Sequence, residues 1–230
     1  MKNEFEKNCT VVNYKNNLFE LLTQEQKESV EKNKVSLKFN KGETIFKQGA
    51  FAGQIMIVES GLVKICMEEG THSLILKIVP KGNIAGLSSL SENSNIYQYS
   101  AIAYIDSIVQ LIDINIFRAI IKKNHDFAAE IINILCANSI QTYGRFFCMT
   151  NKQSFGKMAD VLMCMADNIF RNNEFELDIS RKELAELSGM STEAVIRTLK
   201  KLKDDDIIEI EGKIFRIKNI EKLKQISITG

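Results

Sequence analysis

The chain contains few of the residues that metal-dependent enzymes need. Its 230 residues include two histidines, His72 and His125, and no H-x-H pair, so the histidine-rich metal site of a cupin-type enzyme is not expected. No G-x-S-x-G, P-loop or G-x-G-x-x-G motif is present either. We therefore expect a protein that is not an enzyme and holds no metal ion.

Long apolar runs and paired cysteines are missing as well. No stretch reaches the ~18 apolar residues of a membrane span, and the apolar run Ile102–Ile112 is interrupted by Asp106. The N-terminus carries charges of both signs in place of the apolar core of a signal peptide. The five cysteines form no C-x-x-C pair, and such an odd, dispersed set favours a reducing compartment over a disulfide framework. These features predict a cytoplasmic protein without membrane contact.

Glycine is concentrated in one part of the chain, since seven of the twelve glycines lie between Gly42 and Gly86. Between these glycines lie short β-prone runs, and a second set follows within 100–113; the first set is Thr44–Phe46, Ile55–Glu59, Leu62–Met67 and Ser73–Val79. Short strands at near-regular spacing with glycine turns predict a sandwich or barrel. Thr23 and Gln26 form a capping box, which predicts a helix over 24–32 ahead of the strands.

A long helix is predicted from about Asp126 to Met149. Phe127, Ile131 and Ile134 give it one apolar face. A second stripe recurs at spacings of three and four, and its expected contacts are Ile132, Leu135, Ser139, Thr142 and Phe146. A helix with two such faces needs two partners, so we expect one face to pack on its own domain and the other on a second subunit. Burial of both faces within one domain is the alternative.

The segment after this helix predicts a helix-turn-helix. Thr150–Ser154 is polar and indicates a hinge, and 155–170 is amphipathic. Ser180 and Glu183 form a second capping box. Ala185, Gly189 and Val195 then supply the small residue at the helix crossing, the glycine of the turn and the branched residue inside the second helix.

The second helix, opening at Ser191, is predicted to enter the major groove of DNA. The net charge of the whole chain is only +1, but a DNA-binding face needs only a local excess of cations. Arginine can pair with guanine, and glutamate can accept from cytosine. The expected DNA contacts are Arg181, Lys182, Ser191, Thr192, Glu193, Arg197, Lys200 and Lys201, with Lys203 as a further phosphate contact. A structural helix pair with a solvated polar face is the alternative.

A β-hairpin is predicted immediately after these helices. Ile207–Ile210 and Lys213–Ile217 alternate apolar and polar residues around Gly212. A hairpin in this place makes a winged helix-turn-helix, and Lys213 or Arg216 of the wing are further candidates for DNA backbone contacts.

With its parts in this order, the chain resembles the Crp/Fnr family of bacterial regulators over roughly residues 18–220. The resemblance rests on KGETIFKQG at 41–49, IVESGLVKI at 57–65 and SRKELAELSGMSTEAVIRTLKKL at 180–202. It implies an α+β chain of two domains. Residues 1–149 would form a cyclic-nucleotide-binding-like sensor domain, an N-terminal double-stranded β-helix (a jelly-roll β-roll) with a dimerisation helix at about 126–149. A winged helix-turn-helix DNA-binding domain follows in 150–230.

The resemblance also implies a function. Members of the family are homodimeric transcriptional regulators, so we expect binding to a palindromic (inverted-repeat) DNA site, RNA polymerase as a partner and control by a signal at the β-roll. At the start of the recognition helix, Ser191, Glu193, Val195 and Arg197 match the family pattern. Thr192 replaces the usual arginine, which leaves base reading at that position open.

The sensor domain departs further from the family pattern. Nucleotide-binding members have a glutamate for the ribose and an arginine for the cyclic phosphate, where this chain has Leu87 and Tyr99. An anion buried without a cation opposite it is costly, so we expect cAMP and cGMP to bind poorly or not at all. The corresponding effector pocket would include Gly86, Leu87, Ser88, Tyr99 and Ser100.

Other sensor chemistries remain open at this point. Iron–sulfur members need a cysteine cluster near the N-terminus, where Cys9 stands alone. Haem-dependent redox or nitric oxide sensing is the alternative within the family, with His72, His125 or Cys66 as axial ligand. An apolar metabolite, no ligand at all, or a β-roll that docks on a protein without binding DNA are the other readings.

Overall fold

The computed structural model describes residues 11, 17–70, 72–93, 95–176 and 178–230. The chain forms two compact units, which are described separately: Ile140–Gly230 makes up most of one, and the part before residue 140 makes up most of the other. Among the described residues, no helix combines the length and the apolar character that crossing a membrane requires. Cys9 lies outside the described residues.

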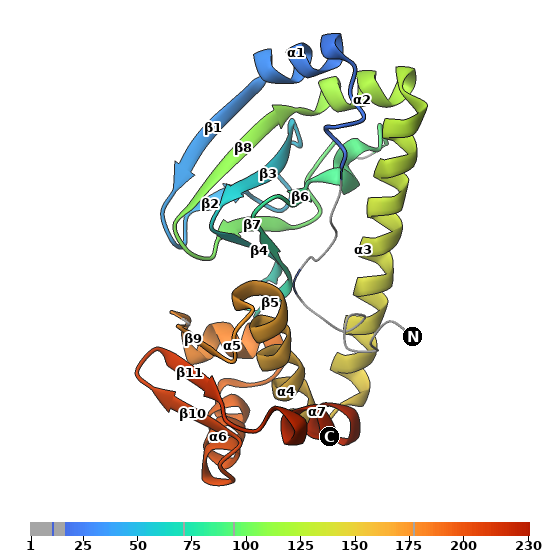
Figure 1. Cartoon of the computed structure of the whole chain (residues 1–230). Helices are drawn as coiled ribbons and strands as arrows, with labels where there is room; N and C mark the ends of the chain where they lie inside the picture. The colour runs from blue at the N-terminus through green and yellow to red at the C-terminus, as the bar shows by residue number, and fades with distance from the viewer. Residues whose placement is uncertain (1–10, 12–16, 71, 94, 177) are drawn as a thin grey trace. The chain divides into compact units, whose positions relative to one another are not determined.

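The first unit is built on a β-roll of two four-stranded antiparallel sheets (Figure 1). One sheet has the order β1-β8-β3-β6, with bounds Lys34–Phe39, Ser107–Asp113, Gln54–Ser60 and Ile84–Ala85. The other has the order β2-β7-β4-β5, with bounds Thr44–Phe46, Ser100–Ala103, Leu62–Glu69 and His72–Pro80. The predicted strands are confirmed. Strand β1 was not predicted, because its side chains are mostly exposed and it lacks a buried apolar run.

One glycine shows why the turns of the roll need this residue. Gly61, between β3 and β4, has φ +88°, and a Cβ there would stand 2.3 Å from the hydroxyl of Ser107. That hydroxyl accepts a hydrogen bond from the N–H of Leu62 at 3.1 Å. A side chain at Gly61 would therefore both strain the backbone and break the link between β4 and β8.

Three helices pack against the first sheet. The predicted capping box of Thr23 and Gln26 is present and opens α1, Gln24–Lys32. Helix α2, Ile114–Lys123, begins at Asp113, whose side chain accepts from the N–H of Asn115, and ends at Asn124 in extended conformation. The sequence did not separate α2 from the next helix. A continuous apolar core joins these helices to the sheet and includes Leu22, Val30, Ile55, Ile84, Leu87, Ile112, Phe117, Phe127, Ile131 and Ile134.

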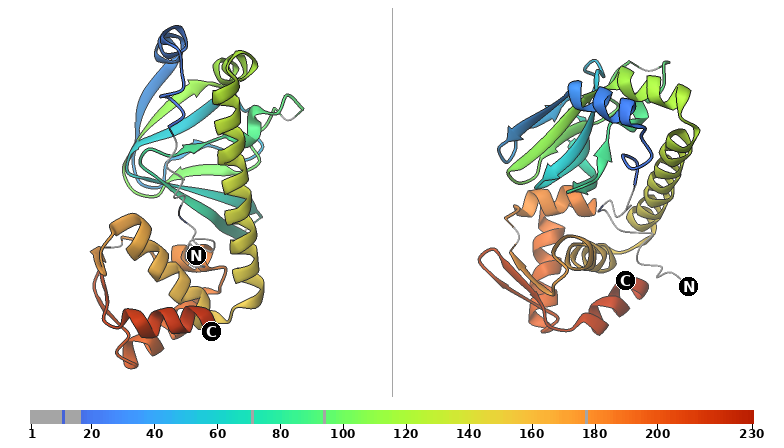
Figure 2. Two further views of the ribbon diagram at one scale, coloured as in Figure 1. Left: turned by 45° about the vertical axis from the view of Figure 1, so that its right-hand side comes forward. Right: turned by 45° about the horizontal axis from the view of Figure 1, so that its top comes forward.

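Helix α3, His125–Asn151, is the long helix that the sequence predicts (Figures 1 and 2). Its first face is buried as expected, since Phe127, Ile131 and Ile134 belong to the core of the first unit. Its second stripe is exposed in the single chain, with Ile132 59% and Phe146 69% accessible. Leu135, Ser139 and Thr142 of the same stripe are exposed too. The described chain therefore leaves one apolar face of α3 uncovered.

The second unit contains the C-terminal helices and the wing. Helix α4, Ser154–Cys164, continues as a π-helical stretch, η3, over Met165–Phe170. A three-stranded sheet has the order β10-β11-β9, with bounds Ile208–Glu211, Ile214–Ile217 and Glu174–Glu176. Helix α7, Ile220–Thr229, packs on α4 (Figure 2, left). The predicted hinge at 150–154 is too long, because Thr150 and Asn151 continue α3 and only two residues separate it from α4.

A buried polar cluster ties the end of α3 to α4 and α7. The ammonium of Lys152 lies 2.7 and 2.8 Å from the two carboxylate oxygens of Asp160, which also accepts from the hydroxyl of Ser227. The thiol of Cys148 donates to the same carboxylate at 2.9 Å. Burial, followed by the contact with Asp160, raises the pKa of Cys148 to about 12. Cys66 and Cys136 are free thiols, as Cys148 is. Cys164 is disulfide-bonded, which departs from the expectation that the dispersed cysteines form no disulfides.

Candidate nucleic-acid interface and sensor site

Two short helices joined by a tight turn form the candidate DNA reader. Helix α5, Arg181–Ser188, begins with the predicted capping box of Ser180 and Glu183, in which each side chain bonds the backbone N–H of the other residue. The helix ends at Gly189, whose φ of +64° lies in the left-handed region. The hydroxyl of Ser191 then accepts from the N–H of Ala194 and opens α6, Thr192–Asp204.

The inner side of the helix pair is closely packed. Ala185 and Val195, predicted for the crossing and the interior, are 5% and 0% exposed. Gly189 is required for space as well as for its φ, because a Cβ there would lie 2.6 Å from the terminal methyl of Met149. Thr198 is also buried, although its polar side chain did not predict this. The pair is therefore a rigid platform for the outer face of α6.

The outer face of α6 presents exposed cations. Arg197, Lys200 and Lys203 are exposed, and no ion pair or side-chain hydrogen bond joins them to another described residue. Lys182 of α5 is exposed in the same way. Between these charges the side chain of Ile196 is 52% accessible. Such a surface combines charge for phosphates with an apolar group that can contact a base.

Two other predicted contacts are already engaged. The ammonium of Lys201 forms an ion pair with Asp205 one turn later, at 2.9 Å. The guanidinium of Arg181 lies over the ring of Phe215, 5.7 Å from its centre, and burial lowers its pKa. Both side chains would have to leave these partners, or share them, to meet a phosphate.

The residues that open α6 are held at its N-terminus. Glu193 is exposed, and its pKa lies below the ordinary range because its carboxylate accepts hydrogen bonds from its own N–H and from the hydroxyl of Ser191. Glu193 is therefore an acceptor at neutral pH, as reading a cytosine amino group requires. Thr192, at the position where the sequence departs from the family pattern, is half-buried.

The wing cations are neutralised by carboxylates. Arg216 pairs with Glu174 at 2.7 Å, Glu211 at 2.8 Å and Glu209 at 3.3 Å, and these partners raise its pKa. Lys213 pairs with Asp178 at 2.8 Å. Both wing cations are therefore paired with carboxylates, whereas Lys182 of α5 and Arg197, Lys200 and Lys203 of α6 have no ion pair with a described residue.

At the predicted sensor site, Gly86, Ser88 and Tyr99 contact one another. The N–H of Gly86 donates to the hydroxyl of Tyr99 at 3.0 Å, and the hydroxyl of Ser88 lies 3.5 Å from the same oxygen. Phe46 stacks on Tyr97, with ring centres 4.0 Å apart, and lies 6.0 Å from the Tyr99 ring. The predicted effector-pocket residue Tyr99 is thus in contact with Phe46, Gly86 and Ser88.

The other two predicted pocket residues, Leu87 and Ser100, contact other parts of the β-roll. Leu87 is 4% exposed and packs in the core beneath α2. The hydroxyl of Ser100 donates to Glu68 at 3.0 Å and accepts from the N–H of Gln48 at 3.0 Å. Sequence reasoning missed Arg118 of α2, whose guanidinium donates to the carbonyls of Ser89 at 3.0 Å and of Leu90 at 3.3 Å. Arg118 thereby holds η2, the 3-10 turn Leu87–Leu90, in place. No local sequence motif predicts this role of Arg118.

The candidate haem ligands lie on three different elements of the fold. His72 begins β5 and His125 begins α3, and both are exposed. Cys66 is buried on β4. Within the described part of the chain, no three histidine, cysteine, aspartate or glutamate side chains form a group that could hold a metal ion.

Comparison with known proteins agrees with this geometry. A model of the cyclic nucleotide-binding domain matches residues 36–124, and a model of the Crp-like helix-turn-helix domain matches residues 156–226. Together the two models cover well over half of the chain, and they fall on the β-roll and on the helix-turn-helix with its wing.

Characterised relatives and solved structures show the same organisation. The transcriptional activator protein FnrA of Stutzerimonas stutzeri is 22% identical over 77% of this chain and 74% of its own length. The cAMP-activated global transcriptional regulator CRP of Salmonella typhimurium is 25% identical over 76% of this chain and 86% of its own.

Among solved structures, FixK2 from Bradyrhizobium japonicum aligns with TM-score 0.77 at 18% identity over 86% of this chain and 98% of its own. A putative regulator of the Crp/Fnr family from Eubacterium rectale aligns with TM-score 0.79 at 16% identity over 93% and 99%. With its cyclic nucleotide-binding-type β-roll and its Crp-like helix-turn-helix, the chain belongs to the Crp/Fnr family of DNA-binding transcriptional regulators.

Proposed function

We propose that the protein acts as a homodimer on an inverted-repeat DNA site and that α6 reads one half-site in the major groove. The observation that carries this proposal is the outer face of α6, where Arg197, Lys200 and Lys203 are exposed around Ile196 and no described residue pairs with them. Exposed cations without carboxylate partners on a helix-turn-helix suit phosphate and base contacts.

The residues of this face divide into two roles. Arg197 reads a guanine, Glu193 accepts from a cytosine, and Ile196 contacts a thymine methyl group. Lys182, Lys200 and Lys203 contact phosphates, together with the first-turn N–H groups of α5. Arg181 and Lys201 are secondary contacts, because each has a partner within the chain.

Dimerisation would use the uncovered stripe of α3. Ile132, Leu135 and Phe146 are exposed in the single chain, and two copies of the helix could bury them against each other. Residues of one stripe would then meet the same stripe of the partner, with Ser139 and Thr142 between them. The two copies of α6 would stand about one turn of DNA apart.

The signal that controls the dimer would act on the β-roll and would not be a cyclic nucleotide. The bonded Tyr99 and Gly86 support this, since they close the place of the phosphate. A haem-dependent signal is the alternative, and His72 and His125 are accessible to it. The setting of this function would be the cytoplasm, with RNA polymerase as partner at the promoter.

The test is selection of bound sequences from a random duplex library with the full chain and no added ligand. We expect an inverted repeat with half-sites one turn apart. The same selection with Arg197→Ala should lose the preferred base at one position of each half-site, whereas Lys222→Ala on α7 should recover the wild-type site. Recovery of no sequence, both without and with cell extract, would favour a β-roll that docks on a protein.

The dimer is tested separately by sedimentation. We expect twice the chain mass for the wild type and for Asn133→Asp, which alters an exposed residue of α3 outside the stripe. Phe146→Asp should shift the equilibrium toward the single chain, because it places a charge within the apolar stripe. A wild type that sediments as a single chain would contradict the proposed dimer.

A further inference from the structure

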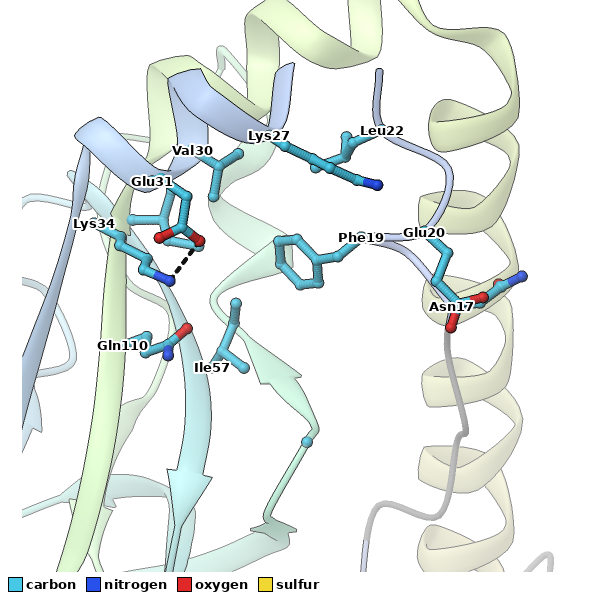
Figure 3. A pocket seen from close by; sticks show the side chains of 12 residues that line it. Asn17, Phe19, Glu20, Leu22, Lys27, Val30, Glu31, Lys34, Ile57 and Gln110 are labelled. Atoms are coloured by element: carbon cyan, nitrogen blue, oxygen red, sulfur yellow. Dashed lines mark hydrogen bonds and ion pairs between the residues drawn. The ribbon is translucent and has the colours of Figure 1, made fainter. Parts of the chain in front are cut away.

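A cavity of about 540 Å³ lies under α1, on the helical side of the β1-β8-β3-β6 sheet (Figure 3). Its floor is formed by Ile57 of β3 with Gln110 and Ile112 of β8. Its roof is α1, and its remaining wall is the segment 17–22. The volume falls in the range of about 300–1,000 Å³ that is typical of small-molecule sites.

The cavity is distinct from the site that nucleotide-binding relatives would use. None of Gly86, Ser88 or Tyr99 is among its lining residues. Those three residues contact one another, whereas this cavity is open space bounded by the segment 17–22, α1, β1, β3 and β8. A ligand could therefore enter it without displacing Tyr99.

The lining is mostly apolar and carries one cation that no other described residue pairs. Phe19, Leu22, Val30, Ile57 and Ile112 provide the apolar walls. The ammonium of Lys34 is engaged by Glu31 at 2.6 Å. Lys27 forms no ion pair or side-chain hydrogen bond with a described residue, and it extends from α1 across the opening (Figure 3).

Among the described residues, no ion pair joins Lys27 to Glu20 or Glu31, the two carboxylates of the lining. The amide of Gln110 donates to Glu59 at 3.2 Å. Glu20 and Asn17 stand at the edge away from Lys34 and Gln110 (Figure 3). An apolar cavity whose mouth carries an ammonium that no described residue pairs matches a ligand with an apolar body and a single negative charge.

We propose that this cavity binds a small monocarboxylate with an aliphatic or aromatic body, and that binding regulates the protein. The apolar body lies against Phe19, Ile57 and Ile112, and the carboxylate meets Lys27 at the mouth. A phosphate ester is a poorer match, because a second negative charge would find only Lys34, which Glu31 already holds.

The regulatory part rests on the proposed function and on a shared core. Ile57 in the cavity floor is paired in the sheet with Ile84, two residues before Gly86. Leu22, Val30 and Ile112 of the lining belong to the same apolar core as Leu87 of η2 and as Phe127 and Ile131 of α3. Because a packed core transmits small displacements, filling the cavity would bias both η2 and the dimer helix.

Calorimetry on the full chain tests the site, with hexanoate, octanoate and decanoate as probes and 1-octanol as the uncharged reference. We expect affinity to rise about fourfold per added methylene, the equivalent of about 0.8 kcal/mol. Octanoate should bind more tightly than 1-octanol. Failure of all three carboxylates to bind would overturn the site, whatever the outcome of the DNA selection.

Three variants locate the binding. Lys27→Gln should weaken octanoate about tenfold and leave 1-octanol unchanged, whereas Lys32→Gln, on an exposed part of α1 outside the cavity, should change neither. Ile57→Trp should abolish binding of both by filling the cavity. Equal octanoate affinity in Lys27→Gln and the wild type would overturn the role of Lys27, and this variant decides the question even if Ile57→Trp fails to fold.

The regulatory part has its own measurement, the affinity of the full chain for the selected DNA site with and without saturating octanoate. We expect a change of at least threefold in the wild type and none in Lys27→Gln at the same concentration. Octanoate binding that leaves DNA affinity unchanged would overturn regulation from this cavity, although DNA binding itself would stand.

Discussion

The hydroxyl of Tyr99 accepts a hydrogen bond from the backbone N–H of Gly86 at 3.0 Å. In nucleotide-binding relatives we expect an arginine in place of Tyr99, opposite a bound phosphate. Here the tyrosine hydroxyl is the acceptor for the Gly86 backbone N–H. This bond is the basis of two of the predictions below.

The first prediction is that cAMP and cGMP do not bind in the low-micromolar range. Entry of a cyclic phosphate would break the Tyr99–Gly86 bond and bury an anion without a cation to pair it. Calorimetry with the purified chain checks this. Saturable heat with a low-micromolar dissociation constant would show that Tyr99 moves aside and that another group meets the phosphate.

The second prediction concerns the stability of the closed site. Tyr99→Phe keeps the ring but leaves the buried N–H of Gly86 without its acceptor, so the free energy of unfolding should fall by about 1–3 kcal/mol. Ser88→Ala removes only the longer 3.5 Å contact and should cost less. Urea denaturation of both variants measures the difference, and equal stability of Tyr99→Phe and the wild type would contradict the closing role of the hydroxyl.

The third prediction is that Arg197→Ala weakens binding to the preferred DNA site by about 1–3 kcal/mol and relaxes the base preference at one position of each half-site. The guanidinium is exposed and has no partner in the described chain, so the substitution removes a DNA contact without breaking an internal one. Competition binding with single-base variants of the site measures it. An unchanged base preference would assign Arg197 to the DNA backbone.

The fourth prediction separates a phosphate contact from base reading. Lys203→Ala should lower the slope of log affinity against log salt by about 1 per subunit, with the same preferred sequence. Lys201→Ala should change the slope less, because Lys201 is already paired with Asp205 at 2.9 Å. A Lys203→Ala protein that selects a different site would show that this residue reads bases.

Local chemistry explains why parts of this fold could be predicted from the sequence. The helices that begin after Thr23 and Ser180 are capped by pairs of side chains three residues apart. Such a capping box can be recognised from the sequence alone. The turn at Gly189 follows from one residue and its φ. The long helix α3 was predictable because two apolar faces repeat at helical spacing.

The features that escaped prediction depend on partners distant in the sequence. Helix α7 is held by its packing on α4, and β9 by pairing with β11. The ion pairs of Arg216 with three glutamates could not be predicted, because the folded wing brings together residues from β9, β10 and β11. The cavity under α1 is likewise assembled from β1, β3, β8 and the segment before α1, so no local pattern announces it.

The last prediction concerns pH and Lys77 of β5, which is half-buried and donates to Asn138 of α3 at 3.2 Å. Burial lowers its pKa from 10.5 to about 8. Below pH 8 the side chain is charged in both the folded and the unfolded state, and the cost of burying the charge is fully present. Above pH 8 the folded protein releases the proton while the unfolded chain keeps it until about 10.5, so stability attributable to Lys77 rises across this window.

The measurement compares the wild type with Lys77→Met by urea denaturation from pH 7 to 10.5. Lys77→Met should be the more stable protein at pH 7, and its advantage should shrink by up to about 3 kcal/mol as the pH rises, since one pKa unit corresponds to about 1.36 kcal/mol. Lys81→Met, at an exposed lysine, should show a constant difference from the wild type. If the advantage of Lys77→Met does not change with pH, the ammonium of Lys77 remains solvated in the folded protein.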